Sequence, residues 1–169
     1  MDDMINRLIK KQKIKLLVLD VDGTLTDGKI YISNEGEFFK TFDIKDGCGI
    51  HDILPKCDIL PAIITGRKSQ ILEKRCKELN IVNLYQGVTN KIDKLDELLS
   101  TFELTYDNVA YIGDDINDLY CMKKASLIGC PSDAVKEVIT IADFVSGKIG
   151  GNGAVREFIE WLVEGKWMV

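Results

Sequence analysis

The 169-residue sequence has no apolar run long enough to cross a bilayer, and no secretory-type apolar core follows its first lysines. The apolar run at residues 14–19 is short and leads directly into acidic residues. The formal net charge is −5, which argues against binding to a nucleic-acid backbone as the main function. We therefore expect a protein that neither enters a membrane nor binds nucleic acid.

Paired cysteines are also missing. The five cysteines are scattered without C-x-x-C spacing, and His51 is the single histidine. This pattern indicates reduced thiols and predicts a cytoplasmic location.

Hydrophobic residues make up 46% of the chain and charged residues 29%, with no repeat, low-complexity tract or linker. These proportions predict one globular domain over residues 1–169.

Residues 18–28, Val-Leu-Asp-Val-Asp-Gly-Thr-Leu-Thr-Asp-Gly, form the most informative stretch. An apolar run ends here in Asp20 and Asp22, a pattern typical of a buried strand and the turn that follows it. Ligands of open α/β sheets lie beyond the carboxyl ends of the strands, where two carboxylates repel each other unless a cation or proton lies between them. Such oxygen ligands suit Mg²⁺ completed by a substrate phosphate. The plainer alternative is an acidic turn that caps a helix.

The rest of the chain alternates between short apolar runs and amphipathic stretches. This alternation predicts an α/β fold with a doubly wound, Rossmann-like parallel sheet, interrupted by a small hairpin after the first strand. Helices are expected at residues 4–11, 46–55, 69–79, 90–102, 132–139 and 154–163, and from residue 115 to about 124. Sheet strands are expected at residues 14–19, 59–64, 82–85, 109–112, 126–130 and 144–145, and the hairpin at residues 29–42.

The predicted hairpin carries the apolar side chains Ile30, Ile32, Phe38 and Phe42. A two-stranded hairpin cannot bury such side chains by itself. We therefore expect it to pack against something else, and closed symmetry between copies of the chain would bury its strands.

Polar residues follow several predicted strands and could meet at one edge of the sheet. Phosphoryl transfer needs a carboxylate nucleophile, an acid that protonates the leaving oxygen and later activates water, and groups that neutralise the phosphate oxygens. Asp20 fits the nucleophile and Asp22 the acid and base. The other candidates are Thr65 as a phosphate donor, Lys91 as a fixed positive charge, and Asp114, with Asp115 and Asp118 nearby, as a remote metal ligand.

Each residue also has a plainer interpretation. Thr65 with Gly66 is more often a turn, Lys91 is more often a solvated helix residue, and residues 113–115 are as often a helix N-cap as a ligand. Their order and spacing as a set are what is specific. A two-component receiver domain also gathers carboxylates, threonine and lysine, but there the threonine and lysine follow the single aspartate, whereas here both precede Asp114.

The set resembles the haloacid dehalogenase superfamily of phosphohydrolases, over most of the chain. The motifs that carry the resemblance are D-x-D-G-T at residues 20–24, Thr65, Lys91 and G-D-D-x-x-D at residues 113–118. The resemblance implies Mg²⁺ held by the side chains of Asp20 and Asp114 and by the main-chain carbonyl of Asp22. Because no large insertion separates the motifs, the chain resembles the branch that lacks a cap domain.

Within this branch the chain is similar to phosphatases of sugar acid phosphates. The stretches that carry this similarity are residues 45–47, 63–68, 75–76, 84–87, 109–115 and 150–157. The similarity implies an eight-carbon sugar acid 8-phosphate as substrate, in lipopolysaccharide biosynthesis. One alternative is a nine-carbon neuraminate-type 9-phosphate, but relatives of that kind commonly carry Glu where Arg67 stands here. A second alternative is a non-catalytic phosphatase-like assembly module.

The resemblance also implies substrate contacts and an assembly. Arg67 and Arg75 would bind the sugar acid carboxylate, since a guanidinium offers a planar fork of donors. The family further implies a homotetramer with the hairpin of residues 29–42 at its centre. Because the sequence ends soon after Trp167, we expect no long C-terminal tail over a neighbouring site. The other expected substrate contacts are Asp22, Asp43, Ile44, Lys45, Asp46, Gly47, His51 and Lys91.

Overall fold

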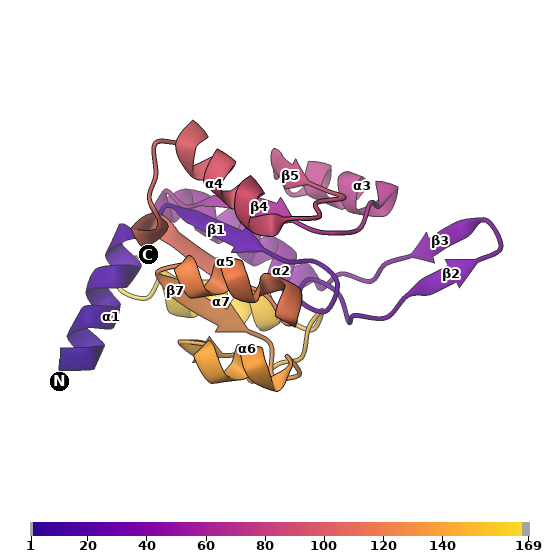
Figure 1. Cartoon of the computed structure of the whole chain (residues 1–169). Helices are drawn as coiled ribbons and strands as arrows, with labels where there is room; N and C mark the ends of the chain where they lie inside the picture. Colours follow the sequence, from indigo (N-terminus) through magenta and orange to yellow (C-terminus); the bar gives the residue numbers. More distant parts are fainter. Residues whose placement is uncertain (1, 167–169) are drawn as a thin grey trace.

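The computed structural model describes residues 2–166, so Trp167 lies outside the described residues. Its centre is a six-stranded parallel sheet with the order β5-β4-β1-β6-β7-β8 (Figure 1). The chain thus winds outward from β1 in both directions, which confirms the predicted doubly wound sheet. The strands are β1 (Leu16–Leu19), β4 (Leu60–Ile64), β5 (Asn83–Tyr85), β6 (Val109–Ile112), β7 (Leu127–Cys130) and β8 (Phe144–Val145), with β2 (Tyr31–Ser33) and β3 (Gly36–Phe39) forming a separate hairpin.

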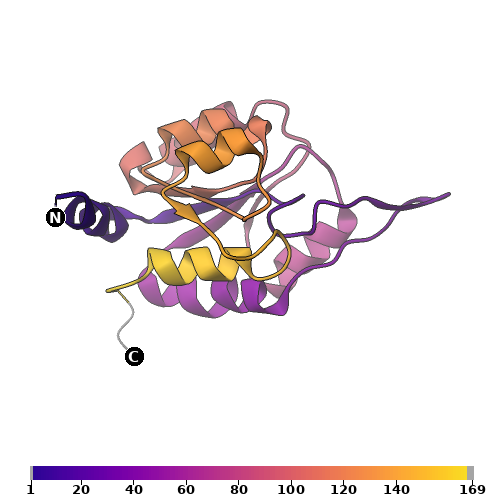
Figure 2. The same ribbon diagram turned by 90° about the horizontal axis from the view of Figure 1, so that it is seen from below.

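Helices cover both faces of the sheet, as parallel strands require (Figure 2). Among residues 2–166, no helix is long and apolar enough to cross a membrane. One face is covered by α2 (Ile44–Cys48), α3 (Gln70–Glu78) and α7 (Ala154–Leu162). The opposite face is covered by α4 (Lys91–Thr101), α5 (Leu119–Lys124) and α6 (Lys136–Ile141), and α1 (Asp2–Lys13) precedes β1.

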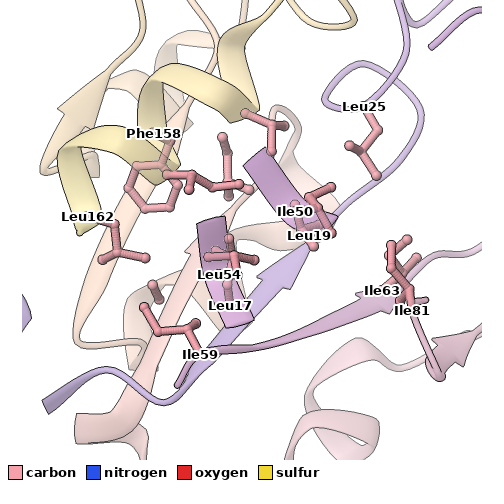
Figure 3. Packing of buried hydrophobic residues seen from close by; sticks show 14 of the residues in the cluster. Leu17, Leu19, Leu25, Ile50, Leu54, Ile59, Ile63, Ile81, Phe158 and Leu162 are labelled. Atoms are coloured by element: carbon pink, nitrogen blue, oxygen red, sulfur yellow. The ribbon is translucent and has the colours of Figure 1, made fainter. Parts of the chain in front are cut away.

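β1 lies at the centre because all of its side chains are buried. Leu17 and Leu19 pack on the α7 side of the sheet with Phe158 (Figure 3). Leu16 and Val18 pack on the other side with residues of α4 and α5. A strand buried on both faces needs a continuous apolar run, and residues 16–19 provide it.

The helix expected from residue 46 begins earlier than predicted, at Ile44. Asp43 caps it, because its side chain accepts hydrogen bonds from two main-chain N–H groups of the first turn. The helical path then continues as a π-helical turn at Gly49–Ile53 and a 3-10 turn at Leu54–Cys57.

The helix expected at residues 132–139 also begins elsewhere, because α6 spans Lys136–Ile141. The residue before it, Val135, donates its main-chain N–H to the carbonyl of Asp114 at 2.9 Å. The start of α6 is therefore set by a contact with a distant loop, which local sequence patterns do not encode.

The hairpin of β2 and β3 projects from the body as an arm (Figure 1). The rings of Tyr31 and Phe39 stack across it, with centroids 4.2 Å apart. Phe42 does not lie on the hairpin as predicted, because β3 ends at Phe39 and the Phe42 ring packs against the core. The apolar side chains that remain exposed around the arm include Ile30, Ile32 and Phe38, at 60, 73 and 67%.

The position of β1 between β4 and β6 brings the residues after these strands to one edge of the sheet. A second loop supports the turn after β1, because the N–H of Gly151 donates to the carbonyl of Thr24 at 3.0 Å. A Cβ at Gly150 would lie 1.9 Å from the carbonyl oxygen of Gly23, so this approach requires glycine. Within the turn, a Cβ at Gly23 would lie 2.1 Å from Oδ2 of Asp114.

We expect Gly23→Ala to destabilise the fold more than Gly36→Ala. Both glycines have positive φ, at +101° and +118°, so alanine costs about 1–2 kcal/mol of backbone strain at either position. Alanine at position 23 would also overlap Asp114, which costs about 1–3 kcal/mol more. Alanine at position 36 adds no overlap, because no described atom lies within 4 Å of a Cβ there. Urea unfolding of the two variants measures the difference, and equal losses would show that Asp114 moves aside freely.

Candidate active site

Three carboxylates meet at the edge of the sheet where β1 and β6 end. Asp20 follows β1, Asp114 follows β6, and Asp118 ends a 3-10 turn at Ile116–Asp118. One oxygen from each lies within 4.8 Å of the other two, and Asp20 and Asp118 are buried. The structure thus brings Asp20, Asp114 and Asp118 together at the edge where residues after parallel strands were expected to meet.

Lys91, the first residue of α4, inserts its ammonium group among these carboxylates. Its Nζ lies 2.5 Å from Oδ1 of Asp20 and 2.8 Å from Oδ1 of Asp118. The hydroxyl of Tyr111, on β6, donates to the same Asp118 oxygen at 2.7 Å. Because Lys91 is buried, the interpretation of this residue as a solvated helix lysine is excluded.

The charges in this cluster do not balance, since three carboxylates surround one ammonium group. Burial, followed by repulsion from Asp118, raises the pKa of Asp20 well above that of a free carboxyl, although Lys91 opposes the shift. Burial raises the pKa of Asp114 to about 6. Burial by itself would lower the pKa of Lys91, but the two carboxylates outweigh it and raise that pKa. The fully ionised cluster therefore needs more positive charge.

The donor set fits a hard divalent cation. Oδ2 of Asp118 is buried and has no hydrogen-bond partner among residues 2–166. Asp114 accepts a hydrogen bond from the Thr24 hydroxyl at Oδ1, 2.9 Å away, which fixes the carboxylate beside the other two. Carboxylate oxygens are the ligands that Mg²⁺ prefers, and its charge would offset the excess of carboxylates. The residues present thus agree with the expected Mg²⁺.

Asp22 lies beside the cluster, on the turn after β1. Lys40, which follows β3 of the hairpin, donates to its Oδ1, and Nε of Arg67 lies 3.7 Å from its Oδ2. Within the described part of the chain, Oδ2 has no hydrogen-bond partner. Asp22 is therefore held by a hydrogen bond at one oxygen, while the other oxygen is buried and has only the Arg67 guanidinium nearby. Thr65, buried, follows the neighbouring strand β4.

The residues expected to contact the sugar fall into two groups. Arg67 belongs to the group around Asp22, whereas Arg75 belongs to a second group on α2 and α3. Nη2 of Arg75 lies 3.5 Å from the carbonyl of Asp43, and a Cβ at Gly47 would lie 2.3 Å from the same nitrogen. Among residues 2–166, Arg75 contacts Asp43, Glu78 and the ring of Phe42, and none of these contacts reaches the carboxylate cluster.

Asp46 and His51 have other partners as well. Oδ1 of Asp46 accepts the main-chain N–H of Arg156 at 2.7 Å, near the start of α7, and burial raises the pKa of Asp46 to about 6. His51 is exposed, with Nδ1 2.7 Å from Asp52 and Nε2 3.1 Å from Asn80. Ile44 and Lys45 are exposed on the surface of α2. Sugar contacts from these residues remain predictions.

Sequence reasoning missed three residues that organise the site. Asp118 was visible in the G-D-D-x-x-D motif but received no role, although it holds Lys91. Tyr111 looked like one more apolar residue of a buried strand. Lys40 carried no signal at all, because its contact with Asp22 depends on the path of the hairpin.

Comparisons with known proteins identify the family. A family model described as haloacid dehalogenase-like hydrolase matches residues 55–159. The 3-deoxy-D-manno-octulosonate 8-phosphate phosphatase of Escherichia coli K12 is 46% identical over 156 residues, covering 92% of this chain and 82% of the relative. The enzyme of the same name from Yersinia pestis is 41% identical, covering 96% and 84%.

Solved structures agree with the sequence matches. The crystal structure of the Yersinia pestis phosphatase superimposes with a TM-score of 0.90 at 40% identity, covering 95% of this chain and 86% of that one. The Moraxella catarrhalis phosphatase, crystallised with a magnesium ion, a phosphate ion and a KDO molecule, has a TM-score of 0.90 at 37% identity, covering 95% and 92%. Both its sequence and its fold show that this chain belongs to the haloacid dehalogenase-like hydrolases.

Proposed function

We propose that this chain is a Mg²⁺-dependent phosphatase that converts 3-deoxy-D-manno-octulosonate 8-phosphate to the free sugar acid and phosphate, a step in lipopolysaccharide biosynthesis. The observation that carries the proposal is the buried cluster of Asp20, Asp114 and Asp118 around Lys91. Relatives that share up to 46% identity over nine-tenths of the chain carry the same activity in their names, which supports the substrate.

The proposed reaction has two steps. A carboxylate oxygen of Asp20 attacks phosphorus, the bond from phosphorus to the C8 oxygen breaks, and Asp22 gives its proton to that oxygen. Water then attacks the aspartyl-phosphate, Asp22 takes a proton from it, and Asp20 and phosphate are released. Thr65 and Lys91 would hold the phosphate oxygens throughout.

The residues proposed to hold Mg²⁺ are Asp20 and Asp114 through their side chains and Asp22 through its main-chain carbonyl. When bound, the ion supplies positive charge against the phosphate oxygens. Lys91 contributes a further fixed positive charge, and Asp118 keeps the lysine in place by accepting from its ammonium group at 2.8 Å.

Asp20→Asn should abolish turnover while leaving the protein folded. The change removes the nucleophile with little change in volume, and we expect activity to fall by at least about three orders of magnitude. Asp115→Asn is the matched control, because Asp115 is the exposed neighbour of Asp114 and its Oδ1 accepts from the adjacent N–H of Ile116. Phosphate release measured with and without Mg²⁺ tests the proposal. Near-normal turnover of Asp20→Asn, or full activity in excess chelator, would contradict it.

The preference for an eight-carbon acid depends on Arg67. Its guanidinium is partly exposed and lies beside Asp22, where it can reach a substrate bound at the carboxylate cluster. Because this guanidinium lies outside the carboxylate cluster that holds Lys91, we assign it to a second anion of the substrate, the sugar acid carboxylate. The alternative is a nine-carbon neuraminate-type 9-phosphate as the preferred substrate.

Arg67→Ala should weaken turnover of the sugar acid phosphate and spare a neutral sugar phosphate. Losing one charge-assisted pair costs roughly 1.5–3 kcal/mol, or about ten- to a hundredfold in kcat/KM. Steady-state kinetics on the two substrates measures the difference. Equal losses would mean that Arg67 serves the phosphate or Asp22 instead, and faster turnover of a nine-carbon acid phosphate by the wild type would favour the alternative.

We also propose that the chain forms a single domain over residues 1–169, acts in the cytoplasm and assembles as a homotetramer through the hairpin. One sheet with helices on both faces supports the single domain, and five cysteines without a disulfide support a reducing location. The exposed Ile32 and Phe38 of the projecting hairpin support the assembly, because large apolar side chains exposed on an arm favour burial against other copies.

Charges on the hairpin should therefore dissociate the assembly. We expect wild-type protein to scatter light as a tetramer and the double variant Ile32→Glu, Phe38→Glu to scatter as a monomer or dimer. Val82→Glu is the control, since Val82 is 91% exposed but lies on the body of the protein rather than the arm. A wild-type monomer with full activity at assay concentration would refute the assembly.

A further inference from the structure

The base of the hairpin carries a buried cation that touches the proposed acid. The side chain of Lys40 is only 5% exposed, and its Nζ contacts Oδ1 of Asp22. A second carboxylate, Glu37, lies 3.2 Å from the same nitrogen. A buried ammonium group needs such partners, because removal from water penalises an unpaired charge strongly. The position of Lys40 is therefore set by Asp22 on one side and Glu37 on the other.

Glu37 is anchored in turn to the body of the protein. Its Oε2 accepts from the hydroxyl of Ser69, the residue that caps α3. The N–H of Ser69 donates to the side chain of Gln86 at 2.7 Å, which ties this end of α3 to the segment after β5. A continuous set of polar contacts thus runs from α3 through the hairpin to the turn after β1.

These contacts leave the two oxygens of Asp22 in different states. Lys40 occupies Oδ1, whereas Oδ2 is buried, has no hydrogen-bond partner among residues 2–166 and has Arg67 at 3.7 Å. A carboxylate oxygen can exchange a proton with a leaving group only if it has no other hydrogen-bond partner and points toward that group. Because the carboxylate is planar and rotates about a single bond, a contact that holds one of its oxygens also fixes the direction in which the other points.

We propose that Lys40 is a positioning residue that orients Asp22 for proton transfer, and that the hairpin reaches the active site through it. The inference depends on the proposed function, because it assumes that Asp22 is the acid. Lys40 itself need not touch the substrate. Its effect is on how well Oδ2 of Asp22 meets the leaving oxygen.

The inference is tested by comparing substrates whose leaving groups differ. A sugar phosphate leaves as an alkoxide and needs the proton, whereas an aryl phosphate leaves as a phenolate and needs it much less. Lys40→Met should lower kcat on 3-deoxy-D-manno-octulosonate 8-phosphate by about ten- to a hundredfold and lower kcat on 4-nitrophenyl phosphate by much less. Lys40→Arg should recover most of the loss, because it restores a donor at Oδ1.

Two further variants keep the test independent of folding. Lys29→Met is the control, because Lys29 lies at the start of the same arm but is exposed and pairs only loosely with Asp27, at 3.8 Å. If Lys40→Met does not fold, Glu37→Gln should show the same difference between the two substrates, with a smaller loss of kcat, because it weakens the hold on Lys40 without removing the lysine. Equal losses on both substrates, or no loss on either, would overturn the role of Lys40.

Asp22→Asn separates this inference from the proposed function. If Asp22→Asn shows the leaving-group dependence and the Lys40 variants do not, the proposed function stands and the inference about Lys40 is wrong. If Asp22→Asn also loses activity equally on both substrates, Asp22 is not the acid, and the inference about Lys40 falls together with that role of Asp22, whereas Asp20→Asn still tests the phosphatase function by itself.

Discussion

The structure depends on keeping three carboxylates together in a largely buried place. Asp20, Asp114 and Asp118 approach within 4.8 Å, and Coulomb repulsion between them would open the site unless positive charge were supplied. Lys91 supplies part of it from the first turn of α4, with its ammonium group between two of them. The negative charge that remains makes this edge of the sheet a place for a divalent cation. The same excess of carboxylates that destabilises the fold therefore suits the site to phosphate chemistry.

The parts of the site that could be predicted are those encoded within a single element. Asp20 follows a continuous apolar run that can only be a strand buried on both faces, and Asp114 follows another. A parallel sheet in which β1 lies between β4 and β6 then forces their carboxyl ends together. Lys91 stands at the start of a helix with a clear apolar stripe, so its place near that edge also followed from local pattern and topology.

What could not be predicted depends on contacts between distant segments. The start of α6 is set by Val135 donating its main-chain N–H to the carbonyl of Asp114. Lys40 reaches Asp22 only because the chain that follows the hairpin returns to the turn after β1. The same holds for Arg75, which matched the family pattern yet contacts Asp43 and Glu78 in this chain.

The support that Gly150 and Gly151 give to the turn at Gly23 and Thr24 has a consequence for the order in which the protein can mature. The turn with the proposed nucleophile lies in the first sixth of the sequence, but Gly150 and Gly151, which support it, belong to a loop near the other end. A chain emerging from the ribosome cannot complete this turn until residue 151 has left the exit tunnel. Contacts of such long range also slow folding, because their loop must close before they stabilise anything. A nascent chain should therefore expose its acidic turn for most of synthesis, with the three carboxylates still apart and unable to hold a metal ion.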